Sequence, residues 1–334
     1  MYSGIRDFTL IWAGYPDIVT GMKDLGLVGL EVYVGPDLKS SDYSDMGVRA
    51  STGLDFSNAA ARRQFQKTLR DHGVKISAIL IENDFGRENL EAELKWMRAA
   101  SMVAQQLETD VVRINSVMSP KQGVPLEKYV ERTVQAVTQA IKSTESVSFA
   151  MENHGVVGNR EDFIVEVLEG VNSDRFGLTL DTGNFYWYGY PLSKVYDLVS
   201  RFAPHVKHTH VKNMTFSPDA REKMRDWCRD WPKEATPIFE GDIDYSKVLR
   251  KLELAGYGRD ITIEDESLGN YPKDKALQFL KRDAEFLNGL LSRFARHESW
   301  HGSTRSRTER SIKKPVSIKA SPARRRTLKL DYLM

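Results

Sequence analysis

Three carboxylates and one imidazole follow short apolar runs at four separate points of this chain. They are Glu152 after residues 147–151, Asp181 after 176–180, His210 after 206–209 and Glu264 after 261–263. Together they form an oxygen-rich, moderately hard ligand set of the kind that binds Mn²⁺, Mg²⁺, Co²⁺ or Zn²⁺. We expect one divalent metal ion, with Mn²⁺ the first candidate. Each acid by itself also has a simpler interpretation as a solvated loop carboxylate or a helix cap, as Asp181 before Thr182 would be.

The runs before these residues are brief and mostly β-branched or aliphatic, as buried parallel strands are. Parallel strands need crossover helices between them, and ligand sites in such folds gather at the strand ends. Similar runs occur earlier, at residues 8–12, 27–34, 74–81 and 111–114. Amphipathic stretches separate the runs, at residues 17–25, 59–72, 90–107, 126–142, 161–171, 192–202, 245–254 and 273–294.

This alternation of strand and helix candidates predicts an α/β fold, the (β/α)8 TIM barrel. Gly73 and Gly256 stand where a helix end favours a residue that tolerates positive φ, which supports the segmentation. An open doubly wound sheet is the alternative. It ranks lower because the chain has no GxGxxG or Walker sequence to form a phosphate loop.

The C-terminal part of the chain differs in composition from the rest. Residues 296–334 contain eleven Lys or Arg and three acidic residues, a net charge of +8, so residues 1–295 carry −6 of the overall +2. We therefore predict one barrel domain at 1–295 and a basic, low-complexity tail at 296–334. Its Ser- and Arg-rich sequence favours a disordered terminus. A basic arm for nucleic acid or another anionic partner is the alternative.

Cys228 is the only cysteine, which excludes an intrachain disulfide and favours a reducing compartment. We expect no catalytic role for this thiol. No apolar run approaches the ~18 residues of a membrane span, and the N-terminus has no basic segment followed by a long apolar stretch. We expect a soluble, cytoplasmic protein with no membrane partner.

Five short motifs give the chain a family resemblance. They are Met151-Glu152-Asn153-His154-Gly155, Leu180-Asp181-Thr182-Gly183-Asn184, His210-Val211-Lys212-Asn213, Glu240-Gly241-Asp242-Ile243-Asp244 and Thr262-Ile263-Glu264. In this order they resemble the motifs of the xylose-isomerase-like TIM-barrel superfamily of sugar isomerases and epimerases, over most of residues 26–286. The resemblance implies a metal site at Glu152, Asp181, His210 and Glu264, in agreement with the ligand chemistry.

The resemblance also implies a reaction. A metal ion between a carbonyl and an adjacent hydroxyl oxygen of a ketose stabilises the enediolate that forms when a carbon-bound proton leaves. In related epimerases two metal-binding glutamates act as general acid and base, which correspond to Glu152 and Glu264 here. We therefore expect a metal-dependent sugar isomerase or epimerase. The best-defined ketose 3-epimerases have proline where Asn153 stands and histidine where Asn184 stands, so the sugar and the carbon stay open.

Two further motif residues and a second histidine are candidates for binding substrate. His208 and His210 lie two residues apart and face the same side of a strand. The resemblance favours His210 as the ligand, with His208 as a deeper supporting group or a substrate contact. His154 could orient substrate, bind a second ion or cap a loop. Lys212 could pair with a substrate oxygen or form an ordinary salt bridge, for example with Asp181.

Other polar and aromatic residues are expected to face the mouth of the barrel. Glu31 lies in the second strand candidate, Glu82 follows the third and Asn184 follows the sixth, where all three could hydrogen-bond sugar hydroxyls. Arg113 could hold a carboxylate or phosphate by its fork, or form an internal salt bridge with Glu82. Trp187 could stack on a sugar. Residues 214–239 form a long connection that we expect to act as a lid, and its aromatics could instead pack loops or a dimer interface.

Three other functions remain as alternatives. A lyase, dehydratase or C-glycoside-cleaving enzyme would use the same proton abstraction on a keto-sugar and end in elimination. An AP-endonuclease-like DNA repair enzyme on the same barrel would need three zinc ions, for which seven histidines are a thin supply. A noncatalytic sugar-binding barrel would leave the intact ligand set without a purpose. By analogy with related barrels we also allow for a homo-oligomer or a partner subunit.

Overall fold

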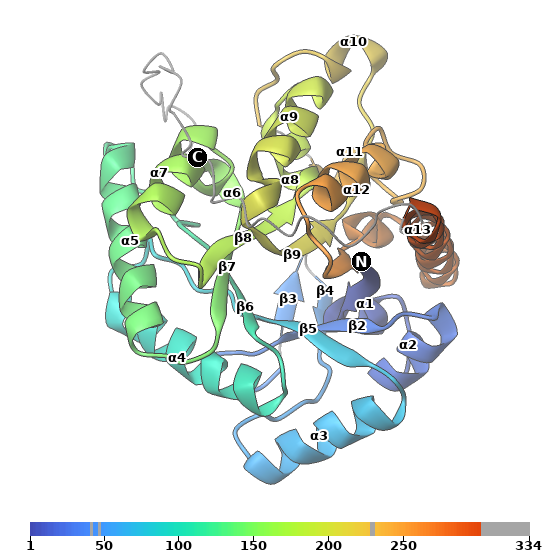
Figure 1. The fold of residues 1–334 in the computed structure, drawn as a ribbon, viewed down its shortest axis with the longest axis horizontal. Helices are drawn as coiled ribbons and strands as arrows, with labels where there is room; N and C mark the ends of the chain where they lie inside the picture. Colours follow the sequence, from blue (N-terminus) through green and yellow to red (C-terminus); the bar gives the residue numbers. More distant parts are fainter. Residues whose placement is uncertain (41–42, 46–47, 228–230, 302–334) are drawn as a thin grey trace.

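The computed structural model describes residues 1–40, 43–45, 48–227 and 231–301, and its centre is a closed barrel of parallel strands (Figure 1). Around the barrel the strands follow the order β1-β12-β9-β8-β7-β6-β5-β2. They are β1 (Tyr2–Arg6), β2 (Gly29–Tyr33), β5 (Lys75–Leu80), β6 (Val111–Ile114), β7 (Ser148–Glu152), β8 (Phe176–Asp181), β9 (Val206–Val211) and β12 (Asp260–Ile263). The predicted (β/α)8 TIM barrel is therefore confirmed.

Helices surround the strands (Figure 1). Those that alternate with the barrel strands are α1 (Asp7–Trp12), α2 (Ile18–Leu25), α3 (Ala59–Asp71), α4 (Leu90–Gln106), α5 (Leu126–Lys142), α6 (Gly155–Gly158), α7 (Glu161–Val171), α8 (Thr182–Tyr188), α9 (Leu192–Phe202), α12 (Tyr245–Leu254) and α13 (Lys273–His301). Helix α13 continues past residue 295, and residues 302–334 lie outside the described residues. The division into a barrel and a basic tail therefore stays a prediction.

The first barrel strand lies before the run that we predicted to form it. Residues 8–12 belong to α1, and β1 is a segment that contains Ser3, Gly4 and Arg6. A short apolar run fits a strand or a buried helical turn, and periodicity cannot separate the two. Gly4 suits the crowded wall, because a Cβ there would lie 3.0 Å from Thr262 Oγ1 and 3.1 Å from the Gly29 carbonyl oxygen. The prediction for this strand was wrong, and the error concealed Arg6 at the strand end.

The helix ends follow their sequences. Gly73 and Gly256, after α3 and α12, have φ of +71° and +84°, the left-handed region that glycine tolerates. At the N-termini, the side chain of Asp17 accepts a hydrogen bond from Thr20 N, and that of Asn58 accepts one from Ala60 N. These caps satisfy amides that have no partner within the helix. No helix within the described ranges is both long and apolar enough to cross a membrane.

The long connection after β9 contains a small sheet of its own. Strand β10 (Asn213–Met214) pairs antiparallel with β11 (Ala235–Thr236), and α10 (Pro218–Arg221) and α11 (Trp231–Glu234) lie between them in sequence. Trp227 packs edge-on against Trp187, with ring centroids 5.2 Å apart. The connection thus contacts α8, whereas Cys228 lies outside the described residues. A second short hairpin, β3 (Tyr43–Asp45) and β4 (Val48–Ala50), follows β2.

Candidate metal centre

Four side chains meet where neighbouring barrel strands end. Glu152 ends β7, Asp181 ends β8, His210 lies in β9 and Glu264 follows β12. These strands are successive neighbours in the barrel, and the ladder pairs Asp181 directly with His210. One possible ligand atom from each lies within 4.8 Å of the others, and all four residues are buried. The structure therefore brings together the four residues that the sequence singled out.

The imidazole of His210 lies between carboxylates. Its Nε2 is 2.9 Å from Glu31 Oε2, whereas its Nδ1 faces Glu264 Oε2 at 3.1 Å and Glu152 Oε1 at 3.5 Å. Burial would lower the pKa of His210, but the surrounding carboxylates raise it well above its ordinary value. A bare Nδ1 lone pair facing two carboxylates would be repulsive, so this position favours a cation, either a proton or a metal ion.

Asp181 uses its two oxygens for different purposes. Oδ1 accepts a hydrogen bond of 3.0 Å from Asn184 N and so caps α8, while Oδ2 lies 3.0 Å from Lys212 Nζ. The helix-cap interpretation and a ligand role are therefore compatible. Burial raises the pKa of Asp181 to about 7, although the charge of Lys212 opposes this shift. Lys212 Nζ also contacts Glu264 Oε2 at 2.8 Å and Glu266 Oε1 at 3.0 Å.

An arginine contacts each of the two glutamates. Arg113 forms a buried ion pair with Glu152 Oε2, and Arg6 forms one with Glu264 Oε1. Burial opposes ionisation of Glu152, but Arg113 and then His210 hold its pKa well below the usual range. For Glu264, His210, Lys212 and Arg6 likewise outweigh burial and lower the pKa. Both glutamates are therefore carboxylates at neutral pH.

The atoms that face one another in this cluster lack ordinary hydrogen bonds. Within the described residues, Asp181 Oδ2, His210 Nδ1 and Glu264 Oε2 are buried and have no hydrogen bond of normal geometry, although Lys212 Nζ lies within 3.0 Å of the two carboxylate oxygens. Buried polar atoms without partners are costly in a protein. Three carboxylates and one imidazole match the ligand preferences of a divalent ion. The residues present therefore fit a bound metal.

The two positions at which the sequence departs from ketose 3-epimerases join β7 to β8. Asn153 Oδ1 accepts a 2.8 Å hydrogen bond from Asp181 N, and its Nδ2 donates one of 2.7 Å to the Asp181 carbonyl oxygen. Asn184 Nδ2 donates a 2.8 Å hydrogen bond to Glu152 Oε1. Both amides thus hold candidate ligands in place.

A cavity of about 190 Å³ lies beside the cluster. It is lined by Arg6, Glu82, Arg113, His154, Asn184, Trp187, Lys212, Asn213, Met214, Ala235, Glu264 and Glu266. All the residues that we predicted to bind substrate are among these, except Glu31 and His208. His208 is fully buried between Glu31 and Asp260. Of the two roles considered for it, this position favours a supporting group over a substrate contact.

Two neighbours of this site, Arg6 and Glu266, were not assigned to it from the sequence, and a third, Glu31, was expected only as a contact for sugar hydroxyls. Arg6 was concealed by the misplaced first strand. Glu266, two residues beyond Glu264, reaches the cavity because the chain turns into a 3₁₀ helix there. Glu31 instead contacts both His208 and His210 across the barrel and is not among the residues that line the cavity.

His154 is half-buried at the cavity wall. Its Nδ1 lies 3.3 Å from Asn115 Oδ1. Burial lowers the pKa of His154 to about 4, so its imidazole is neutral at neutral pH. An uncharged imidazole therefore faces the cavity beside the cluster.

The fold is a closed parallel barrel, and an acidic cluster that contains a histidine lies at its strand ends. These two features place the chain among TIM-barrel proteins with a site suited to a metal ion. The model of one such family, described as the xylose isomerase-like TIM barrel, matches residues 20–287. Since this match covers most of the chain, the chain belongs to the xylose isomerase-like TIM barrel family.

Individual relatives are distant. An uncharacterised protein of Methanocaldococcus jannaschii is 23% identical over 199 residues, which are 58% of this chain and 62% of that protein, less than two thirds of its length. A D-tagatose 3-epimerase-like protein has a similar structure, with a TM-score of 0.60, 16% identity and coverage of 87% of this chain and 100% of its own.

Two further solved structures have the same fold. The probable 3-DHS dehydratase AsbF of Bacillus anthracis has a TM-score of 0.60 and 15% identity, over 86% of this chain and 99% of its own. The IOLI protein, solved with a zinc atom, has a TM-score of 0.62 and 14% identity, over 85% of this chain and 96% of its own. At this identity the likenesses establish the fold and leave the reaction open.

Proposed function

We propose that this chain is a metal-dependent isomerase or epimerase that moves a proton at the carbon next to a carbonyl group of a sugar or keto-sugar. The observation that carries the proposal is the buried cluster of Glu152, Asp181, His210 and Glu264 at the edge of a cavity. A divalent ion held by these residues would polarise the substrate's oxygens as a Lewis acid. Mn²⁺ stays the first candidate, and the zinc atom in the IOLI protein supports Zn²⁺ as the second.

Glu264 is the residue that we propose to accept the carbon-bound proton. It is an ionised carboxylate that lines the cavity, and Arg6 and Lys212 fix its orientation. A positioned carboxylate within reach of the substrate can act as a general base. Its orientation by two cations supports this role because the base must stay aligned with the carbon.

Glu152 is less accessible than Glu264. Its two oxygens contact Arg113 and Asn184, and it does not contribute to the cavity lining among the described residues. The neutral His154 does line the cavity. This difference favours His154 over Glu152 as the second proton-transfer group, and it leaves Glu152 as a ligand.

The same arrangement supports a lyase or dehydratase as the second candidate. His154 offers an uncharged imidazole, and Lys212 offers a buried cation that could hold the oxygen of a leaving hydroxyl group in the same cavity. The likeness to a probable dehydratase points in this direction as well. The small cavity supports a small-molecule substrate over nucleic acid.

The first test is a metal count on the full-length protein after loading with Mn²⁺, Co²⁺ or Zn²⁺ and removal of free ions. Near one ion per chain supports the four-residue site, about three zinc ions would favour the endonuclease, and none would favour a noncatalytic barrel. The loaded protein is then incubated with ketoses and keto-sugars in deuterated water. We expect deuterium incorporation that Glu264→Gln abolishes; unchanged incorporation in that variant would contradict the role of Glu264. Product mass separates isomerisation from loss of water.

A further inference from the structure

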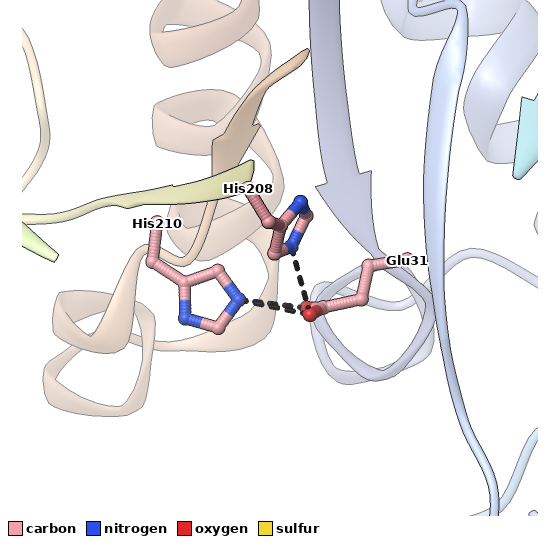
Figure 2. Close-up of side chains that lie close together, drawn as sticks. All are labelled: Glu31, His208 and His210. Atoms are coloured by element: carbon pink, nitrogen blue, oxygen red, sulfur yellow. Dashed lines mark hydrogen bonds and ion pairs between the residues drawn. The ribbon is translucent and has the colours of Figure 1, made fainter. Parts of the chain in front are cut away.

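Glu31 contacts the imidazoles of His208 and His210 at once (Figure 2). Its Oε1 is 2.9 Å from His208 Nε2 and 3.0 Å from His210 Nε2, and its Oε2 is 2.9 Å from His210 Nε2. Side-chain exposure is at most 1% for all three residues. Glu31 comes from β2, which β12 and β1 separate from β9 around the closed barrel.

The contacts continue beyond His208. Its Nδ1 lies 2.7 Å from Asp260 Oδ2, and Asp260 Oδ2 also accepts a hydrogen bond of 2.9 Å from Thr262 Oγ1. Four buried groups thus form a continuous series from Asp260 through His208 and Glu31 to His210. Each member has its position fixed by the next, and the far end of the series is the imidazole of the candidate metal centre.

This series determines which nitrogen of His210 is free to bind a metal. An ionised carboxylate only accepts hydrogen bonds, so the Nε2 atoms of His208 and His210 must both carry hydrogen. The Nδ1 of His210 then faces Glu264 and Glu152. Both Glu31 oxygens face imidazole nitrogens, and Arg6 Nε lies 3.7 Å from Oε2, an arrangement that suits the carboxylate form.

We propose that Glu31 is a positioning residue of the metal centre. It holds His210 in the tautomer and ring orientation that present Nδ1 as the ligand atom, and His208 with Asp260 holds Glu31. This inference rests on the metal site of the proposed function. A carboxylate that accepts from the distal nitrogen of a ligating histidine fixes the ring and raises the basicity of the ligand.

The same three residues could instead hold a second metal ion, since their donor atoms lie within 4.8 Å of one another. The contacts favour positioning. Both Glu31 oxygens and both His208 nitrogens already have a partner within 3.0 Å, and neither residue contributes to the cavity lining. An ion there would have no open position for substrate.

The test is Glu31→Gln in the full-length protein, with Zn²⁺ binding measured by calorimetry and Co²⁺ binding by its visible absorption. In the variant an NH₂ group replaces one carboxylate oxygen. Where this NH₂ group faces the Nε2–H of His210, two donors oppose each other. The imidazole ring must then turn, or its hydrogen must move to Nδ1, the atom that would bind the metal. We expect one ion per chain in both proteins, a metal Kd raised about 10–100-fold in the variant, and a changed Co²⁺ spectrum.

Glu93→Gln is the matched control. Glu93 is also buried, at 5% exposure, but it contacts Asp84 N and Arg87, outside the cavity. We expect this variant to lose stability and keep its metal affinity and Co²⁺ spectrum. If Glu31→Gln does not fold, Asp260→Asn leaves Glu31 in place, and we expect a smaller loss of affinity in the same direction.

The outcomes distinguish this inference from the proposed function. Unchanged metal affinity and an unchanged spectrum in Glu31→Gln would overturn the positioning role while the metal site stands. Two ions in the wild type and one in the variant would assign Glu31 to a second metal site and overturn it as well. No bound ion in the wild type would overturn the metal site itself.

Discussion

Buried carboxyl groups of the barrel fall into two groups: those in contact with a cationic side chain and those without such a contact. Glu31, Glu152 and Glu264 each lie against histidine or arginine side chains, and all three have lowered pKa values although burial opposes ionisation. These carboxylates keep the charge that metal ligands and proton acceptors need. Of the three, Glu264 is the one that lines the cavity.

The second group has no such partner. Within the described residues, no ion pair with Lys or Arg is formed by Asp7, Asp265 or Asp283, and burial raises the pKa of each, that of Asp7 to about 7. Besides burial, the negative charge of Asp265 raises the pKa of Asp283. Among these six carboxyl groups, burial raises the pKa of those without a contacting cation and is outweighed in those that have one.

Asp181 combines features of both groups, and its replacement has the largest expected effect. It contacts Lys212, yet burial raises its pKa to about 7, so it is the candidate ligand that a metal ion would stabilise most as a carboxylate. For Asp181→Asn we expect metal affinity to fall by more than the ~100-fold that loss of a supporting residue costs. The amide also removes a buried acid, so we expect the metal-free variant to be at least as stable as wild type at pH 8.

Calorimetric titration with Zn²⁺ and chemical denaturation in the presence of a chelator measure these two effects. Glu93→Gln again serves as the control for loss of a buried acid away from the cluster. Metal affinity within a few-fold of wild type in Asp181→Asn would remove Asp181 from the ligand set.

The Arg113–Glu152 pair offers the next largest effect. Arg113→Met leaves Glu152 as a buried carboxylate without its arginine, and breaking a buried pair in this way costs about 3–5 kcal/mol. We expect that loss in the free energy of unfolding of the metal-free protein, measured in urea at pH 8. The double variant Arg113→Met/Glu152→Gln should recover part of it. A loss below about 1 kcal/mol would indicate a pair solvated like one on the surface.

Asp7, which belongs to the carboxyl groups without a contacting cation, predicts that the stability of the protein depends on pH. Because the pKa of Asp7 is about 7 in the folded state and 3.8 is its ordinary value, the folded protein binds more protons than the unfolded chain between these pH values. Stability contributed by the protonated group is therefore present at low pH and lost as pH rises toward 7, by at most about 1.4 kcal/mol per pH unit. Asp7→Asn mimics the protonated form, so we expect it to gain stability relative to wild type at pH 8 and little at pH 4. Denaturation of both proteins across this range is the measurement, and a constant difference would contradict the shift.

The sequence allowed the barrel and the four candidate ligands to be predicted, but not the groups that hold them. Each ligand stands at the end of its own strand run, and parallel strands bring such ends to one edge whatever their separation in the chain. The contact of Glu31 with His208 joins residues 177 apart. It depends on the register with which the barrel closes, which no local pattern encodes. Arg6 was missed for a local reason, because the apolar run beside it forms a helix.

A surface ion pair gives the smallest expected effect and tests whether burial is what makes pairing matter. Lys67 and Asp71 lie one turn apart on α3, with Nζ 2.6 Å from Oδ2, and their side chains are 69% and 53% exposed. Water and salt screen such a pair, and ordering two exposed side chains opposes its formation. For Asp71→Asn we therefore expect a denaturation midpoint within measurement error of wild type, at low and high salt alike. A salt-sensitive loss as large as that of Arg113→Met would mean that the cation itself, and not its burial, separates the two groups of carboxylates.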